Sequence, residues 1–145
     1  MPQVDFYILP EQATVERFTC EIADQIHGQG LDVYVLAGSR NAALALDDLM
    51  WTWKDTSFLP HRLVDSDDDA CRITIGWEGA GNRAGQVLIN LVTTVPQDAG
   101  NFERVVEFVP PGATEKQLAR QRYRQYREAG FELRNHDLNA PDELS

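Results

Sequence analysis

Two nearly continuous apolar segments, separated by one amphipathic pattern, constrain the fold of this chain most strongly. Residues 4–9 read VDFYIL and residues 31–37 read LDVYVLA. Apolar runs rich in β-branched and aromatic residues are typical of strands that are covered on both faces. The apolar residues between them recur at intervals of three and four, which predicts a helix from about Thr14 to Gly28; they are Val15, Phe18, Ile22 and Ile26. Strand, helix and strand in this order predict a βαβ unit with parallel strands.

The remaining chain continues the alternation of strands and helices. Ser39 is a candidate N-cap for a second helix that ends near Trp51. Further strands are expected at 62–64, 73–77, 86–92 and 104–109, followed by a helix at about 114–129. This order predicts an α/β fold: an open, mainly parallel, Rossmann-like sheet with helices on both faces. We expect residues 1–133 to form one α/β domain and the polar, acidic residues 134–145 to form a disordered tail.

Two short patterns resemble ligand sites but do not fit them. Gly79-x-Gly81-x-x-Ala84 matches the dinucleotide fingerprint only nominally, because a strand rather than a helix is expected from about Gln86. The alternating Asp65, Asp67 and Asp69 resemble the first ligands of a calcium loop, yet Gly76 stands where a bidentate Glu is required. With Asp68 these residues are interpreted as a solvated turn. The sequence therefore predicts no nucleotide-binding loop, no cofactor and no metal site.

The helix expected at about 114–129 differs in charge from the rest of the chain. The net charge of the chain is −10, yet residues 115–127 contain five basic residues and one acid. Projection at ~100° per residue places four cations on one stripe, namely Lys116, Arg120, Arg124 and Arg127. Arg122 falls on the packing side. A basic stripe is often only a solvated surface, but in an acidic chain it also attracts nucleic acid, acidic peptides or carboxylate termini.

Residues at both ends of this helix are typical helix start and stop signals. Pro110 and Pro111 precede it, and Thr114 with Gln117 forms a candidate capping box. Gly130 suits the left-handed position that follows a helix.

Aromatic residues gather in the segment after the second helix. Trp51, Trp53 and Phe58 lie within eight residues of apparent loop. Such a cluster either packs onto the core or forms an anchor surface for another protein.

No group of residues in the sequence demands catalysis. His27, His61 and His136 have no neighbouring ligand or nucleophile at a usable spacing. Cys20 and Cys71 are expected to be reduced and buried, and no secretory signal or membrane-spanning run occurs, which predicts a cytoplasmic protein. We therefore expect no intrinsic enzymatic activity.

Several blocks of the sequence resemble one known family. The segment QLARQRYRQYREAGF, preceded by VVEFVP, is similar to the C-terminal signature of the chi subunit of bacterial DNA polymerase III, an accessory subunit of the clamp-loader complex. The N-terminal FYIL and the block that contains Trp51, Phe58, Pro60 and His61 also agree with it. The resemblance covers about residues 4–133, and it implies a Rossmann-like fold without a nucleotide site.

The resemblance implies two partner surfaces. In the chi family the basic helix holds the acidic C-terminal tail of single-stranded-DNA-binding protein, which ends in a phenylalanine. Carried over, Arg120 would meet the terminal carboxylate and Val109 would line the pocket for the ring. We add Lys116 and Arg124, one turn away on either side, as cations that attract the tail. Trp51 and Phe58 match the contact with the psi subunit of the clamp loader, and a repair helicase is expected to compete there.

Two alternatives from other classes remain open at this stage. One is a nucleotide- or metal-dependent nucleic-acid-processing enzyme on a Rossmann-like sheet. The other is direct binding of single-stranded DNA by the basic helix, which we expect to be weak because the chain is acidic overall.

Overall fold

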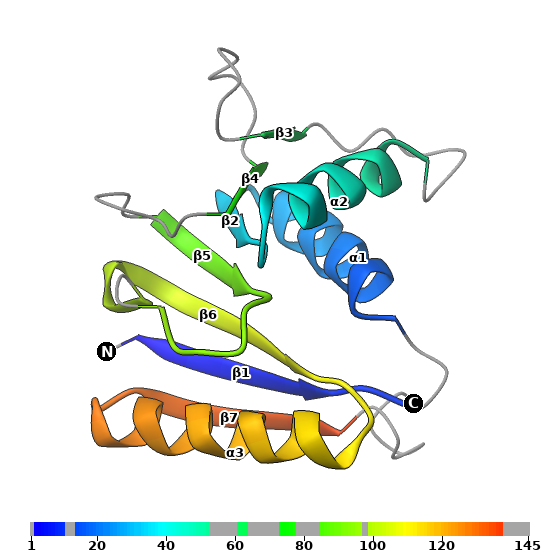
Figure 1. Cartoon of the computed structure of the whole chain (residues 1–145). Coiled ribbons are helices and arrows are strands. Elements are labelled where there is room, and N and C mark those ends of the chain that lie inside the picture. The colour runs from blue at the N-terminus through cyan, green and yellow to red at the C-terminus, as the bar shows by residue number, and fades with distance from the viewer. Residues whose placement is uncertain are drawn as a thin grey trace.

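The computed structural model describes residues 2–10, 14–52, 61–63, 73–77, 85–96 and 99–137. The first half alternates strands and helices in the order β1 (Gln3–Ile8), α1 (Val15–Gly28), β2 (Val33–Leu36) and α2 (Arg40–Thr52). The second half contains β3 (His61–Leu63), β4 (Ile73–Gly76), β5 (Gly85–Asn90), the 3-10 turn η1 (Ala99–Asn101), β6 (Phe102–Val109), α3 (Ala113–Glu128) and β7 (Glu132–Asp137). Figure 1 shows these elements in sequence colours.

The described strands form one seven-stranded sheet in the order β3-β4-β2-β5-β6-β1-β7. Each pairing in this sheet is parallel. The first strand therefore lies inside the sheet, between β6 and the border strand β7, although it begins the chain. The predicted α/β class and the mainly parallel sheet are confirmed.

Helices cover both faces of the sheet, as the sequence predicts (Figure 1). On one face α1 and α2 pack over the central strands, and their core includes Cys20, Ile26 and Leu46. On the other face α3 packs through Ala119 and Tyr126. Right-handed crossovers explain the two layers, because β1 connects toward β2 in one direction and β6 connects toward β7 in the other.

The predicted helix ends are partly confirmed. Thr14 Oγ1 accepts a hydrogen bond from the Arg17 amide at the start of α1, and Ser39 Oγ accepts one from the Ala42 amide at the start of α2. Gly130 follows α3 with a φ of 91°, the left-handed conformation that favours glycine. The capping box at Thr114 is wrong: α3 begins one residue earlier, after Gly112, and no side chain caps it.

The expected boundary between domain and tail is also wrong for residues 134–137. These residues continue β7, which pairs with β1 in the register Gln3↔Glu132. The strand was missed because its sequence, ELRNHD, is mostly charged and lacks the apolar pattern of the other strands. The rest of the expected tail, residues 138–145, lies outside the described part of the chain.

The patterns that resembled ligand sites can be followed only in part. The aspartates at 65–69 and the stretch Gly79–Ala84 lie outside the described residues, but β5 begins at Gly85, so a strand follows that stretch as expected. Among the residues that the structure covers, no group of three or more candidate side chains could hold a metal ion. In the same residues, no helix is both long and apolar enough to span a membrane.

Candidate functional site

A cavity of about 380 Å³ lies between α3 and the carboxyl ends of β1, β6 and β7. Ligands of open α/β sheets commonly bind outside the carboxyl ends of the strands. Three strands, β1, β6 and β7, and the helix α3 each supply part of the wall. The lining residues are Phe6, Ile8, Val109, Lys116, Ala119, Arg120, Tyr123, Asn135 and Asp137.

The inner wall of this cavity is apolar and well fixed. Val109 is the last residue of β6, and its carbonyl accepts a hydrogen bond from the Leu9 amide at 3.0 Å. The rings of Phe6 and Tyr123 are 5.4 Å apart at an interplanar angle of 54°, a favourable tilted contact. Because these contacts hold the wall in place, the cavity offers a preformed apolar surface to an apolar or aromatic group.

The rim of the cavity on the helix side is cationic. Lys116 and Arg120 are both exposed and stand one turn apart on α3. On the opposite rim β7 contributes Asn135 and Asp137. An apolar hollow beside an exposed lysine and arginine suits a ligand that has an apolar end next to a carboxylate.

A buried polar network holds α3 in place beside the cavity. Glu107 is fully buried and Arg122 is 5% exposed, and Arg122 Nε donates to Glu107 Oε1 over 3.0 Å. The other oxygen of Glu107 accepts hydrogen bonds from Asn90 Nδ2 at 2.7 Å and from Tyr126 Oη at 2.6 Å. Every oxygen of the buried carboxylate thus has a partner, which a buried charge requires.

The guanidinium of Arg122 also connects α3 to the segments around it. Its Nη1 donates to the Thr93 carbonyl at 3.2 Å and its Nη2 donates to the Phe108 carbonyl at 3.3 Å. A second, smaller cavity of about 90 Å³ lies on this side of α3, with Asn90 and Arg122 among its lining residues. Arg122 is therefore a structural residue that fixes the helix carrying Lys116 and Arg120.

Burial shifts the titration of this network. Burial raises the pKa of Glu107 to about 7, although the charge of Arg122 and the hydrogen bonds from Asn90 and Tyr126 oppose the shift. Burial also raises the pKa of Tyr126, and the neighbouring charge of Glu107 raises it further. Tyr126 therefore serves as a hydrogen-bond donor to the carboxylate.

A second polar cluster lies on the other face of the sheet, around the buried Asp5. Arg104 Nε donates to Asp5 Oδ2, and His136 Nε2 lies 3.1 Å from Asp5 Oδ1. The imidazole of His136 also stacks on Tyr7, with ring centroids 4.7 Å apart. Burial opposes ionisation of Asp5, but hydrogen bonds from His136 and Arg104 and the charge of Arg104 outweigh it, so the pKa of Asp5 is lowered. This cluster ties β7 to β1 and β6.

The structure brings together three of the four residues predicted for the basic site. Val109, Lys116 and Arg120 line the same cavity. Arg124 is exposed on α3, one turn beyond Arg120, and is not among the residues that line it.

The residues predicted for the second surface are described only in part. Trp51 lies in the last turn of α2, and its side chain is 49% exposed. In the described chain it is the one large apolar side chain with this degree of exposure. Phe58 and Trp53 lie outside the described residues.

Sequence reasoning missed several residues of the site. Asn135 and Asp137 belong to the strand that was interpreted as tail, and Phe6 and Ile8 were treated as core residues only. The alternation of β1 could have placed Phe6 and Ile8 on one face, but nothing local indicates that α3 covers this face. Tyr123 of α3 is partly buried and also lines the cavity.

Fold and cavity together define the class of protein: a parallel α/β domain with a cavity beside exposed cations at the carboxyl ends of its strands. Comparison with known families narrows this class. Residues 1–134 match the family model described as "DNA polymerase III chi subunit, HolC". The chain therefore belongs to the DNA polymerase III chi subunit family.

Curated relatives agree with this assignment over most of their length. A DNA polymerase III subunit chi from Pseudomonas aeruginosa is 34% identical over 141 residues, which cover 95% of this chain and 98% of the relative. The subunit chi of Escherichia coli K12 is 34% identical over 141 residues, which cover 92% of this chain and 96% of the relative. The subunit chi of Haemophilus influenzae is 34% identical over 132 residues, which cover 88% of this chain and 92% of the relative.

Proposed function

We propose that the cavity beside α3 binds the acidic C-terminal tail of single-stranded-DNA-binding protein. The observation that carries this proposal is the meeting of Arg120, Lys116 and Val109 in one cavity with an apolar inner wall. A terminal phenylalanine ring would enter beside Val109, and its carboxylate would accept hydrogen bonds from the Arg120 guanidinium. The planar guanidinium offers paired donors that match a carboxylate, which an ammonium group does not.

The acidic residues that precede the terminal ring would follow the cations of α3. Lys116 and Arg124 stand one turn on either side of Arg120, and all three side chains are exposed. Because these cations lie outside the cavity or at its rim, they would contribute mainly attraction at long range. Arg120 and Val109 would supply the specific contacts.

We also propose that the exposed end of α2 joins the chain to a psi-like subunit of the clamp loader. Trp51 supports this, because a half-exposed tryptophan at a helix end is a common anchor of protein interfaces. Phe58 is the second residue assigned to this contact, and a repair helicase would compete for it. The chain would then act in the cytoplasm as a non-catalytic adaptor between the polymerase assembly and coated single-stranded DNA.

Calorimetry with a synthetic acidic peptide that ends in Ile-Pro-Phe tests the tail site. We expect micromolar affinity for the parent protein and a loss of about 1.5–3 kcal/mol of binding free energy for Arg120→Ala, as for a charge-assisted hydrogen bond. Arg120→Lys should restore only part of this loss. Amidation of the peptide carboxylate should weaken binding to a similar degree.

Two controls make this experiment specific. Trp51→Ala changes an exposed residue of α2, so it should leave the peptide affinity unchanged. Arg17→Ala removes an exposed cation from α1 and should also have little effect. Equal binding by the parent protein and Arg120→Ala would refute the tail site, as would the absence of binding by the parent.

A further inference from the structure

Strand β7 forms one border of the sheet, and its outer side is open in the described part of the chain. It pairs only with β1 among the described strands. The Glu132 amide donates to the Pro2 carbonyl at 3.0 Å. This bond shows which residues of β7 direct their backbone groups toward β1. In a parallel pair the backbone groups of successive residues point to alternate sides. Arg134 and His136 therefore face β1 through their backbone, whereas Leu133 and Asn135 direct theirs to the open side.

The open side of β7 adjoins the cavity. Leu133 packs into the core beneath α3, and Asn135 lines the cavity. Side chains alternate with the same period as the backbone groups. The residues with outward backbone groups are thus also those whose side chains lie on the α3 face.

The cations of α3 run alongside this strand. Lys116 and Arg120 stand at the cavity, near the carboxyl end of β7, whereas Arg127 lies in the last turn of α3, close to the point where β7 begins. Figure 1 shows α3 and β7 side by side with opposite directions. Exposed cations of α3 therefore stand beside the cavity end of β7 and in the helix turn that precedes its first residue.

We propose that the acidic tail binds as an extended strand, parallel to β7, and becomes the eighth strand of the sheet. This proposal rests on the proposed function and adds the mode of binding. The direction follows from the cavity: a carboxyl terminus held by Arg120 lies at the carboxyl end of β7, so the preceding residues run back along the strand beside the cations. Backbone hydrogen bonds to Leu133 and Asn135 would supply affinity, and the cavity would select the terminal residue.

A series of peptides, each methylated at one backbone nitrogen, tests this mode of binding. In an added outermost strand, alternate amides point to β7 and the others point to solvent. We expect a loss of roughly 2–10-fold in affinity for methylation at every second position, as for one lost backbone hydrogen bond, and little change at the positions between. A loss without this alternation would overturn strand addition.

Amide hydrogen exchange of the protein provides an independent readout. At a peptide concentration of about 10–20 times the Kd, exchange of the Leu133 and Asn135 amides should slow by about tenfold. The Arg134 and His136 amides already point to β1 and should change little. If the peptide binds and depends on Arg120, but Leu133 and Asn135 gain no protection, the tail site stands and strand addition fails. If the unmodified peptide does not bind, both proposals fail.

Discussion

At the scale of single residues, the site depends on groups that never touch the cavity. Arg122 lies inside the protein, although four other cations of α3 are exposed. Its contacts with Glu107 and with two backbone carbonyls hold the helix against the sheet. Removal of one member of such a buried pair leaves the other charge without its partner and costs about 3–5 kcal/mol. The exposed cations are therefore free to serve a ligand while Arg122 serves the fold.

The buried carboxylate predicts a particular pH dependence of stability. Because the pKa of Glu107 is raised to about 7, the folded state retains this proton when the unfolded chain has lost it. The contribution of Glu107 to the free energy of unfolding should therefore fall as pH rises from about 5 to 7, with a slope of at most ~1.4 kcal/mol per pH unit. Urea denaturation of the parent protein and Glu107→Gln at several pH values measures this difference.

Glu103→Gln is the matched control for this measurement. Glu103 lies on the same strand but is exposed. As pH rises over this range, the free energy of unfolding of the parent protein should fall relative to that of Glu107→Gln. The difference between the parent protein and Glu103→Gln should stay constant. A parent protein that gains stability relative to Glu107→Gln as pH rises would show instead that Arg122 dominates the titration.

At the scale of elements, the short connection between α3 and β7 positions both walls of the cavity. The helix ends at Glu128 and the strand begins at Glu132, so three residues reverse the chain. Gly130 makes this possible through its positive φ, and the Phe131 amide donates to the Tyr126 carbonyl at 3.1 Å. The geometry of this turn thus sets where Asn135 stands relative to Arg120.

Substitution of Gly130 should be costly for this reason. A side chain in the left-handed conformation costs ~1–2 kcal/mol, so we expect Gly130→Ala to lower the free energy of unfolding by about this amount. Gly100→Ala is the control, because Gly100 has no positive φ and a Cβ there meets nothing within 4 Å. Thermal and urea denaturation of both variants should show a clear loss only at Gly130. Equal stability of the two variants would contradict this role.

Most elements could be predicted from the sequence, since runs such as VDFYIL and the spacing in α1 report burial directly. The last strand could not, because ELRNHD is stabilised by its partner β1 and by contacts such as His136 with Asp5 rather than by its own pattern. The helical projection placed Lys116 and Arg120 correctly on one stripe. It could not show that Arg124 lies beyond the cavity, or that Arg122 finds an acid on a strand 15 residues earlier.

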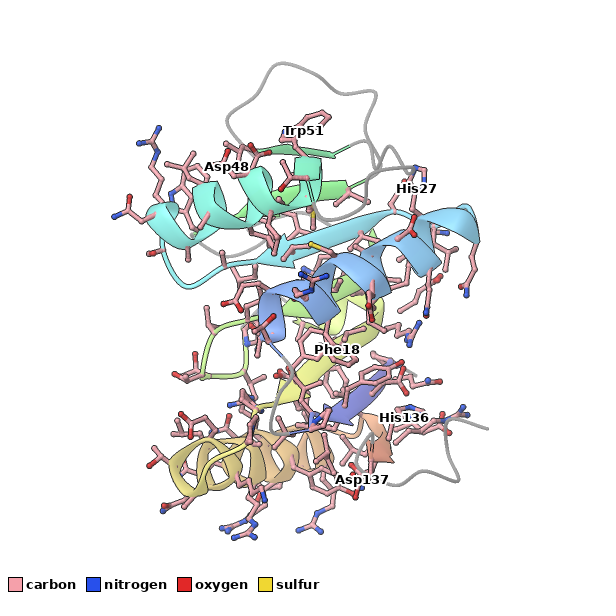
Figure 2. All side chains as sticks on the ribbon, turned by 90° about the vertical axis from the view of Figure 1, so that its right-hand side faces the viewer. Phe18, His27, Asp48, Trp51, His136 and Asp137 are labelled. Carbon is pink, nitrogen blue, oxygen red and sulfur yellow. The ribbon has the colours of Figure 1, made fainter. Side chains whose placement is uncertain are left out.

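At the scale of the whole molecule, the two candidate surfaces lie far apart. Figure 2 shows Trp51 at one end of the molecule and Asp137 at the other. The strand order agrees, because α2 contacts β3 at one border of the sheet and the cavity lies beside β7 at the opposite border. A chain with both proposed sites in this layout could hold two partners at once.

Binding at the two surfaces should therefore be independent. We expect the Kd of the acidic peptide to change by less than about twofold when a psi-like subunit is bound, which corresponds to almost no coupling free energy. Trp51→Ala should weaken binding of the psi-like subunit, whereas the affinity for the peptide should stay the same. Fluorescence anisotropy of a labelled peptide, with and without the second partner, measures this. A large change in Kd would show that the surfaces communicate.

The position of β1 in the sheet has a consequence for synthesis of the protein. Its two neighbours, β6 and β7, are the last strands to be made, so the first strand leaves the ribosome roughly 90 residues before either can join it. Until then its apolar side chains have no sheet to enter. An interrupted polypeptide thus displays its own beginning as an exposed hydrophobic segment, by which chaperones and proteases can recognise an incomplete copy.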